Sequence, residues 1–170
     1  MIARILVPLD GSALSESALG IVDDLARGPG REIELLRVVP SGGAGLATFA
    51  AMGAGAGIDP GWDAALDQQA GEARAYLTSV ARRLPSGTRV HTAVRVGDPP
   101  AEIALRARQG GFDMIVMSTH GRTGLGRWVM GSVADAVAHR TAVPVLLIHP
   151  DLARAARDAD AAVEGANRPA

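Results

Sequence analysis

A glycine-rich run in the second half of the chain has residues that could hold an anion. It reads Ser118-Thr119-His120-Gly121-Arg122-Thr123-Gly124-Leu125-Gly126, and the pair Gly131-Ser132 follows ten residues after Gly121. An apolar stretch over 112–117, typical of a buried strand, precedes the run, and a helical pattern begins at the pair. A glycine-rich turn between a strand and a helix can direct backbone N–H groups at a phosphate. On its own, the pattern fits a plain connection equally well.

The run matches neither of the two commonest nucleotide motifs. The chain has no GxxxxGK[ST] sequence, so it has no P-loop. Gly124-Leu125-Gly126 is followed by Arg127-Trp128-Val129, so the third glycine of a dinucleotide fingerprint is missing. A phosphate site in this run would therefore have to be of another kind.

A second candidate segment, Pro8-Leu9-Asp10-Gly11-Ser12, follows the first apolar run. At the carboxyl end of a parallel strand, a carboxylate can accept hydrogen bonds from ribose hydroxyls or hold Mg²⁺ through water. A lone aspartate more often caps the turn that follows it. Both interpretations of Asp10 stay open.

Strand and helix patterns alternate along the chain and would position these segments. Apolar runs predict strands over 2–7, 32–39, 88–96, 114–118 and 143–149. Helical spacing predicts helices over 14–25, 66–84, 99–109 and 132–140, with Ser12 and Asp98 as N-caps. The order predicts an α/β fold: one open five-stranded parallel sheet with helices on both faces. Ligands bind such sheets at the carboxyl ends of the strands, where the strand order reverses.

The composition excludes one kind of chemistry and argues against two kinds of partner. The chain has 170 residues, no cysteine, 3% aromatic residues and a formal net charge of −1. These values exclude thiol chemistry and argue against nucleic acid or a membrane as partners. No stretch approaches the roughly 20 apolar residues of a membrane span, and we expect a cytoplasmic location.

The expected organisation is one domain over residues 1–150 with a Gly/Ala-rich insertion at 40–62. Such a long insertion is typical of a lid or a disordered loop. Residues 151–170, rich in alanine and charge, predict a flexible or partly helical tail.

The two candidate segments together resemble the universal stress protein family. The family's N-terminal pattern Val-Pro-x-Asp-Gly-Ser stands here as Val7-Pro8-Leu9-Asp10-Gly11-Ser12. The last three fixed positions of its motif Gly-x2-Gly-x9-Gly-Ser/Thr are Gly121, Gly131 and Ser132, while Ser118 replaces the first glycine. Its closing strand resembles residues 143–148. The resemblance covers about residues 1–150.

The resemblance implies an adenine-nucleotide α-hydrolase-like fold that binds ATP, or another adenine nucleotide, with Mg²⁺. It implies that the backbone of Val38 reads the base edge, that Met117 packs near the adenine, and that Asp10, beside Pro8 and Leu9, faces the ribose or the metal. The phosphates would meet a larger set: Ser118, Thr119, His120, Gly121, Arg122, Gly131, Ser132 and Val133. The Ser118 side chain would either crowd a phosphate or donate to it.

The resemblance implies a regulatory or sensing module in the stress response rather than an enzyme. The sequence offers no P-loop lysine and no placed base, and slow ATP hydrolysis stays open. It also implies a homodimer that pairs through the edge strand at 143–148. The alternative is a dimeric scaffold that binds other proteins and no nucleotide, which Ser118 and the insertion favour. An adenylyl-transferring enzyme would need a His-x-x-His signature, and Pro8-Leu9-Asp10-Gly11 contains no histidine.

Overall fold

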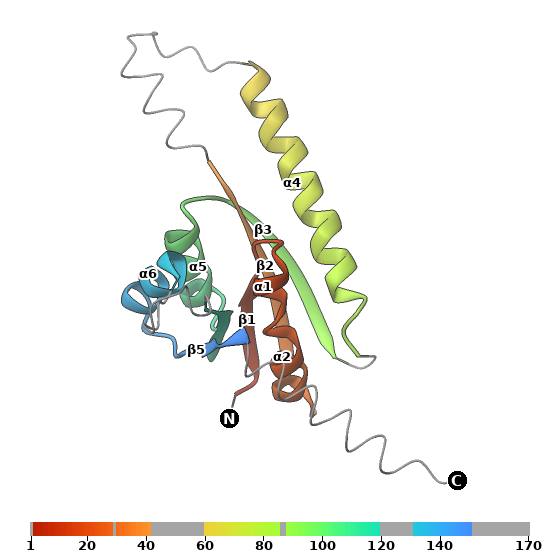
Figure 1. Ribbon diagram of the computed structural model, residues 1–170, viewed down its shortest axis with the longest axis vertical. Coiled ribbons are helices and arrows are strands. Elements are labelled where there is room, and N and C mark those ends of the chain that lie inside the picture. The colour runs from red at the N-terminus through yellow and green to blue at the C-terminus, as the bar shows by residue number, and fades with distance from the viewer. Residues whose placement is uncertain (1, 29, 42–59, 86–87, 120–130, 151–170) are drawn as a thin grey trace, which may run out of the picture.

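One sheet of five parallel strands organises the computed structural model, which describes residues 2–28, 30–41, 60–85, 88–119 and 131–150 (Figure 1). Its spatial order is β3-β2-β1-β4-β5, and every neighbouring pair is parallel. The strands are β1 (Arg4–Pro8), β2 (Glu32–Pro40), β3 (Arg89–Gly97), β4 (Met114–Ser118) and β5 (Val145–Ile148). The predicted five-stranded parallel sheet is confirmed.

Helices cover both faces of the sheet, as predicted. One face packs against α2 (Leu19–Ala26) and α4 (Pro60–Ala81), and the other packs against α5 (Pro99–Gln109) and α6 (Ser132–Arg140). In Figure 1, α4 lies on one side of the sheet, and α5 and α6 gather on the other. The short helix α1 (Ala13–Glu16) follows β1.

The alternation of side chains along β1 explains these two layers. Ile5 and Val7 point into the core shared with α2 and α4, and Leu6 points into the core shared with α5 and α6. All three side chains are fully buried, because β1 is the central strand of the sheet. Burying each contributes about 1.5–3 kcal/mol to stability.

The prediction of a single helix over 14–25 is wrong in one respect, because the structure has two helices there, α1 and α2. The Ser17 hydroxyl donates to the carbonyl of Leu14 at 2.7 Å, and the backbone N–H of Ser17 bonds to the same carbonyl at 3.1 Å. The Ser15 hydroxyl donates to the carbonyl of Ser12 at 2.9 Å. Short hydroxyl side chains that bond nearby carbonyls compete with regular helix, which apolar periodicity does not register.

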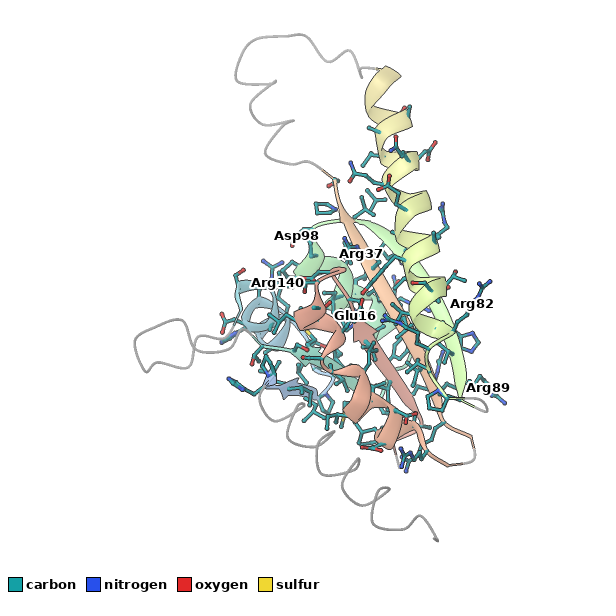
Figure 2. The ribbon with its side chains drawn as sticks, turned by 45° about the vertical axis from the view of Figure 1, so that its right-hand side comes forward. Glu16, Arg37, Arg82, Arg89, Asp98 and Arg140 are labelled. Atoms are coloured by element: carbon teal, nitrogen blue, oxygen red, sulfur yellow. The ribbon has the colours of Figure 1, made fainter. Side chains whose placement is uncertain are left out.

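The start of α5 agrees with the prediction. Asp98 caps the helix by accepting the N–H of Ala101 at 3.3 Å, and Pro99 is its first residue. Asp98 also pairs with Arg140 at the end of α6, with 3.0 Å between Oδ2 and Nη1 (Figure 2). Both side chains are exposed, so the pair adds little stability.

The predicted insertion and tail are only partly within the described residues. β2 extends to Pro40 and α4 begins at Pro60, so both ends of the range 40–62 belong to regular elements. Residues 42–59 and the predicted tail at 151–170 lie outside the described residues. No helix in the described ranges is long and apolar enough to cross a membrane.

The strand order reverses next to β1. The chain runs from β1 outward to β2 and β3, and it returns to β4 on the other side of β1. Two backbone bonds extend the pairing just past the strand ends, from the N–H of Leu9 to Leu36 at 2.8 Å and from the N–H of Thr119 to Ile148 at 2.9 Å. The carboxyl ends of β1 and β4 therefore form the edge where a ligand crevice is expected.

Candidate functional site

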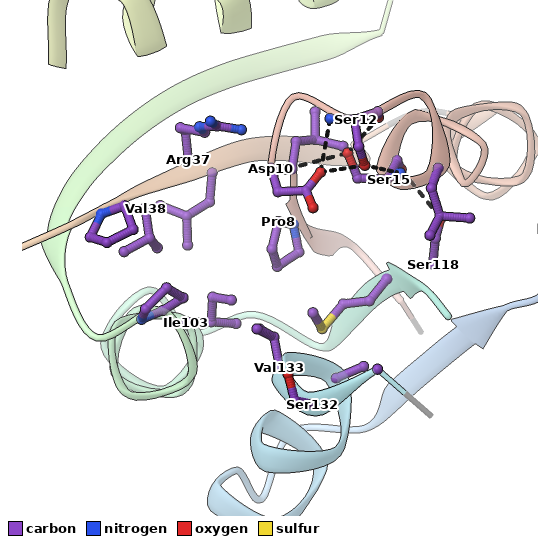
Figure 3. A pocket seen from close by; sticks show the side chains of 18 residues that line it. Pro8, Asp10, Ser12, Ser15, Arg37, Val38, Ile103, Ser118, Ser132 and Val133 are labelled. Atoms are coloured by element: carbon purple, nitrogen blue, oxygen red, sulfur yellow. Dashed lines mark hydrogen bonds between the residues drawn. The ribbon is translucent and has the colours of Figure 1, made fainter. Parts of the chain in front are cut away.

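A cavity of about 350 Å³ opens at this edge of the sheet (Figure 3). Its volume falls in the range of small-molecule sites, roughly 300–1,000 Å³. The cavity brings together nine residues predicted for the site: Pro8, Leu9, Asp10, Val38, Met117, Ser118, Gly131, Ser132 and Val133.

Of the other four predicted residues, the structure describes one, Thr119, which is not part of this lining. Thr119 follows β4, and its N–H donates to the Ile148 carbonyl. His120, Gly121 and Arg122 lie outside the described residues. The gathered residues therefore come from the ends of β1, β2 and β4 and from the start of α6.

Asp10 both shapes the turn after β1 and lines the cavity. Its Oδ1 accepts the N–H of Ser12 at 2.9 Å and the Ser12 hydroxyl at 2.6 Å. Burial acts to raise the pKa of Asp10, but the hydrogen bonds from Ser12 and Ser15 and the charge of Arg37 outweigh it and hold the pKa below 3.8. Asp10 is therefore an anion at neutral pH. Among the described residues, none donates to its Oδ2.

The cavity also has a cation that no sequence pattern indicated, Arg37. Its guanidinium lies 5.7 Å from the ring centroid of Tyr76, and its Nη1 is buried without a hydrogen-bond partner among the described residues. Arg37 also lines a second cavity, of about 380 Å³, on the α4 side of the sheet. The available signal was its position directly before Val38 at the end of β2.

The cavity has an apolar side and a polar side. In Figure 3, Val38 and Ile103 lie on one side of the opening, and Ser118 and Ser132 lie on the other. Ser12 and Ser15 from the start of α1 add two further hydroxyls to the lining. This division suits a ligand with a flat apolar ring and a polar tail.

Backbone geometry at Val38 leaves two polar groups for a ligand. The Leu36 carbonyl accepts the N–H of Leu9, so the main-chain groups of Leu36 point toward β1. Backbone groups two residues apart on a strand point to the same side, so those of Val38 also point toward β1. The pairing with β1 ends at Leu36, and the main chain of Val38 therefore faces the cavity edge with a donor and an acceptor.

The start of α6 offers donors to the polar side of the cavity. Gly131 is the N-cap residue, with φ −58° and ψ 143°, and no side chain caps the helix among the described residues. The first N–H groups of a helix have no partner within it and attract anions. Any residue can adopt this conformation of Gly131, so the backbone alone does not require glycine here. Its lack of a side chain leaves room at the cavity wall.

The hydroxyl of Ser118 points toward α1. Its Oγ lies 3.0 Å from the Oγ of Ser17 and 3.3 Å from the carbonyl oxygen of Ser15. Figure 3 shows Ser15 and Ser118 joined at one end of the cavity.

The sheet order and the position of this cavity define the class of protein: a single α/β domain with the adenine-nucleotide α-hydrolase-like fold. The family model described as the universal stress protein family matches residues 1–149. The chain belongs to the universal stress protein family.

Curated and solved relatives agree with this assignment. Universal stress protein MJ0531 of Methanocaldococcus jannaschii is 30% identical over 146 residues, which cover 85% of this chain and 81% of the relative. The solved structure of MJ0577 from the same organism is 27% identical, with a TM-score of 0.70 over 88% of this chain and 96% of that chain.

Two further solved structures share the fold at lower identity. A universal stress protein in complex with cAMP is 19% identical, with a TM-score of 0.54 over 88% of this chain and 98% of that chain. The universal stress protein of Archaeoglobus fulgidus in complex with dAMP is 18% identical, with a TM-score of 0.52 over 87% of this chain and 98% of that chain.

Proposed function

We propose that this protein binds ATP in the cavity at the carboxyl ends of β1 and β4 and acts as a nucleotide-dependent regulatory or sensing module in the stress response. The observation that carries the proposal is the cavity itself, which joins an apolar side at Val38 to the start of α6. The adenine nucleotides bound to two structures of the same fold support this ligand class.

Different residues of the cavity contact the base, the ribose and the phosphates. The main-chain donor and acceptor of Val38 read the base edge, and Met117 packs near the adenine. Asp10 accepts hydrogen bonds from the ribose through the carboxylate oxygen that has no donor among the described residues. The N–H groups of Gly131, Ser132 and Val133 meet the phosphates at the start of α6.

Mg²⁺ fits this site only when a nucleotide is bound, because the nucleotide would supply further ligands to the ion. Within the described ranges, no group of three or more His, Cys, Asp or Glu side chains is arranged to hold a metal ion. Asp10 is one carboxylate, and Mg²⁺ is commonly held by one or two carboxylates, phosphate oxygens and water. Asp10 would supply a single oxygen or a water-mediated contact, and bound Mg²⁺ would offset the charge of the phosphates.

The proposed role is binding rather than turnover. Phosphoryl transfer needs a positioned nucleophile and cations around the transferred group. Among the described lining residues, Arg37 is the sole cation, and it lies at the β2 end, away from α6. We therefore propose ATP hydrolysis that is slow or absent.

The protein is proposed to form a homodimer through β5 in the cytoplasm. β5 is an outer strand of the described sheet, so one side of its backbone has no neighbouring strand there. Val145, Leu146 and Leu147 are only half-buried in a single chain. A second copy would cover these side chains and the open strand edge. We also propose that residues 1–150 form the domain and that 151–170 are a tail.

Nucleotide content tests the proposal directly. Purified protein is denatured, and the supernatant is analysed by ion exchange for ATP, ADP and AMP. Protein stripped of nucleotide is then titrated with MgATP. Binding predicts a melting shift equivalent to about 2.7 kcal/mol at a hundredfold excess over Kd. No co-purified nucleotide, together with no heat and no shift at millimolar MgATP, would favour the scaffold instead.

A further inference from the structure

We propose that the hydroxyls of Ser17 and Ser118 form a pair that turns the Ser118 hydroxyl toward α1, away from a bound phosphate, and fixes the end of β4 against α1. The inference deepens the proposed function, because it concerns the residue that replaces a glycine of the family motif. It assigns a positioning role to Ser17, which lies outside the cavity lining.

The hydrogen-bond directions follow from counting protons. A serine hydroxyl has one proton to donate and two lone pairs that accept. Ser17 donates its proton to the carbonyl of Leu14 at 2.7 Å, so in the contact at 3.0 Å between the two hydroxyls Ser17 accepts and Ser118 donates. The Ser15 carbonyl, 3.3 Å from the Ser118 Oγ, is a second acceptor for the same proton.

This arrangement has a consequence for a bound phosphate. The Ser118 proton is used within the protein, so Ser118 would have only lone pairs to present to a phosphate oxygen. Rotation of the side chain toward the cavity would break both contacts with α1. The pair therefore directs the Ser118 hydroxyl toward α1 rather than toward a phosphate, which makes the substitution compatible with a nucleotide.

The break between α1 and α2 supplies the acceptors. Ser17 is the C-cap residue of α1, and its bond to Leu14 ends that helix. Ser15, two residues earlier, accepts the backbone N–H of Asp10 at 3.3 Å through its Oγ. One short turn of helix thus fixes both Asp10, in the turn after β1, and Ser118, at the end of β4.

The test compares four proteins: the wild type, Ser17→Ala, Ser118→Gly and the double variant. The Kd values for MgATP and for adenosine are measured for each by titration calorimetry. Ser17→Ala frees the Ser118 side chain to rotate toward the phosphates, and we expect MgATP to bind about fivefold more weakly, because only the molecules with Ser118 turned toward α1 then bind. Adenosine, which has no phosphate, should bind unchanged.

The Ser118→Gly background decides whether Ser17 acts through Ser118. In that background, adding Ser17→Ala should leave the Kd for MgATP unchanged from that of Ser118→Gly alone. Ser79→Ala is the matched control, since the Ser79 hydroxyl also donates to a carbonyl three residues back, on α4. It should leave both Kd values unchanged.

Two results would overturn the inference. If Ser118→Gly tightens MgATP binding severalfold, the side chain intrudes on the phosphate. If Ser17→Ala has the same effect with and without Ser118→Gly, Ser17 acts through the helix alone.

A wild type that binds no MgATP would contradict the proposed function, and melting temperatures then test the pair by themselves. Ser17→Ala and Ser118→Ala should each lower Tm, and the double variant should lower it no further than the larger single effect. Additive shifts would mean that the two hydroxyls do not interact.

Discussion

Asp10 combines two roles that sequence reasoning could only offer as alternatives. One carboxylate oxygen caps the turn through Ser12, and the side chain also lines the cavity. Its position followed from the motif, because the residue after a parallel strand lies at the ligand edge. Arg37 could not be predicted in the same way: alternation along β2 places it on a face, but only the folded structure shows that two cavities meet there.

At Asp10, removal of the charge should weaken nucleotide binding without unfolding the turn. Asp10→Asn keeps an oxygen that can accept from Ser12 but loses the anion that we propose faces the ribose or Mg²⁺. A hydrogen bond to a charged group is stronger than a neutral one by about 1–1.5 kcal/mol, so we expect MgATP to bind roughly tenfold more weakly.

The pKa of Asp10 fixes the pH range of this effect. Because the pKa is held below 3.8, the carboxylate stays charged from pH 5 to 8, and the ratio of wild-type to variant Kd should be constant there. The exposed Asp63 on α4 serves as control, and Asp63→Asn should bind normally. A ratio near one at pH 7 would argue against a role for the charge.

The hydrogen bonds that Asp113 accepts should make the stability of the fold depend on pH. Its Oδ2 accepts the backbone N–H groups of Ala3 at 2.8 Å and Arg4 at 2.9 Å, and these bonds lower the pKa of the carboxyl. A carboxylate with a lowered native pKa stabilises the fold above its unfolded pKa, about 4, and loses that contribution as the pH falls through the native value. Asp113→Ala should therefore lower the urea midpoint at pH 7, and the difference should shrink below pH 4. A difference that grows on acidification would contradict this account.

At the scale of elements, the strands and most helices followed from the sequence. The bounds of β4 and α6 agree with the prediction because apolar runs and helical spacing are local signals. The division between α1 and α2 did not follow, because it depends on the backbone carbonyls to which the Ser15 and Ser17 hydroxyls donate. That division is also the feature that brings Ser17 to Ser118.

The turn between β1 and α1 should be intolerant of a side chain at Gly11. Gly11 has φ +81°, and a Cβ there would lie 2.9 Å from the Nη1 of Arg37. Gly11→Ala should lower the free energy of unfolding by about 1–2 kcal/mol from the backbone conformation alone. Gly71→Ala is the control: Gly71 lies within α4 with open space around it, and alanine there should stabilise by about 0.5–1 kcal/mol. Urea unfolding measures both, and equal effects at the two positions would contradict the account of the turn.

For the whole molecule, the alternating elements predicted the class of fold, whereas the strand order needed the structure. The periodicity of apolar residues indicates which side chains face a core, but it does not indicate which strands are neighbours. A reversal of strand order could therefore be expected, but its place beside β1 could not. The family resemblance provided the particular fold and the expected position of a ligand.

The proposed pairing through β5 predicts the mass of the particle in solution. Sedimentation equilibrium should give a species of roughly twice the chain mass of 17.4 kDa, because the half-buried β5 side chains and the open strand edge favour a second copy. Sedimentation as a single chain at micromolar concentration would contradict the dimer and leave the nucleotide proposal standing.

The central claim, that the start of α6 receives the phosphates of an adenine nucleotide, is tested most directly by titrating wild type and Gly131→Val with MgATP. The backbone conformation of Gly131 is open to any residue, so the variant should fold, with a Tm lowered by the few degrees that valine costs at an N-cap, while its side chain fills the space at the cavity wall. We predict one MgATP site per wild-type chain and no measurable binding to the variant. Equal binding by both proteins, or no binding by the wild type, would contradict the account.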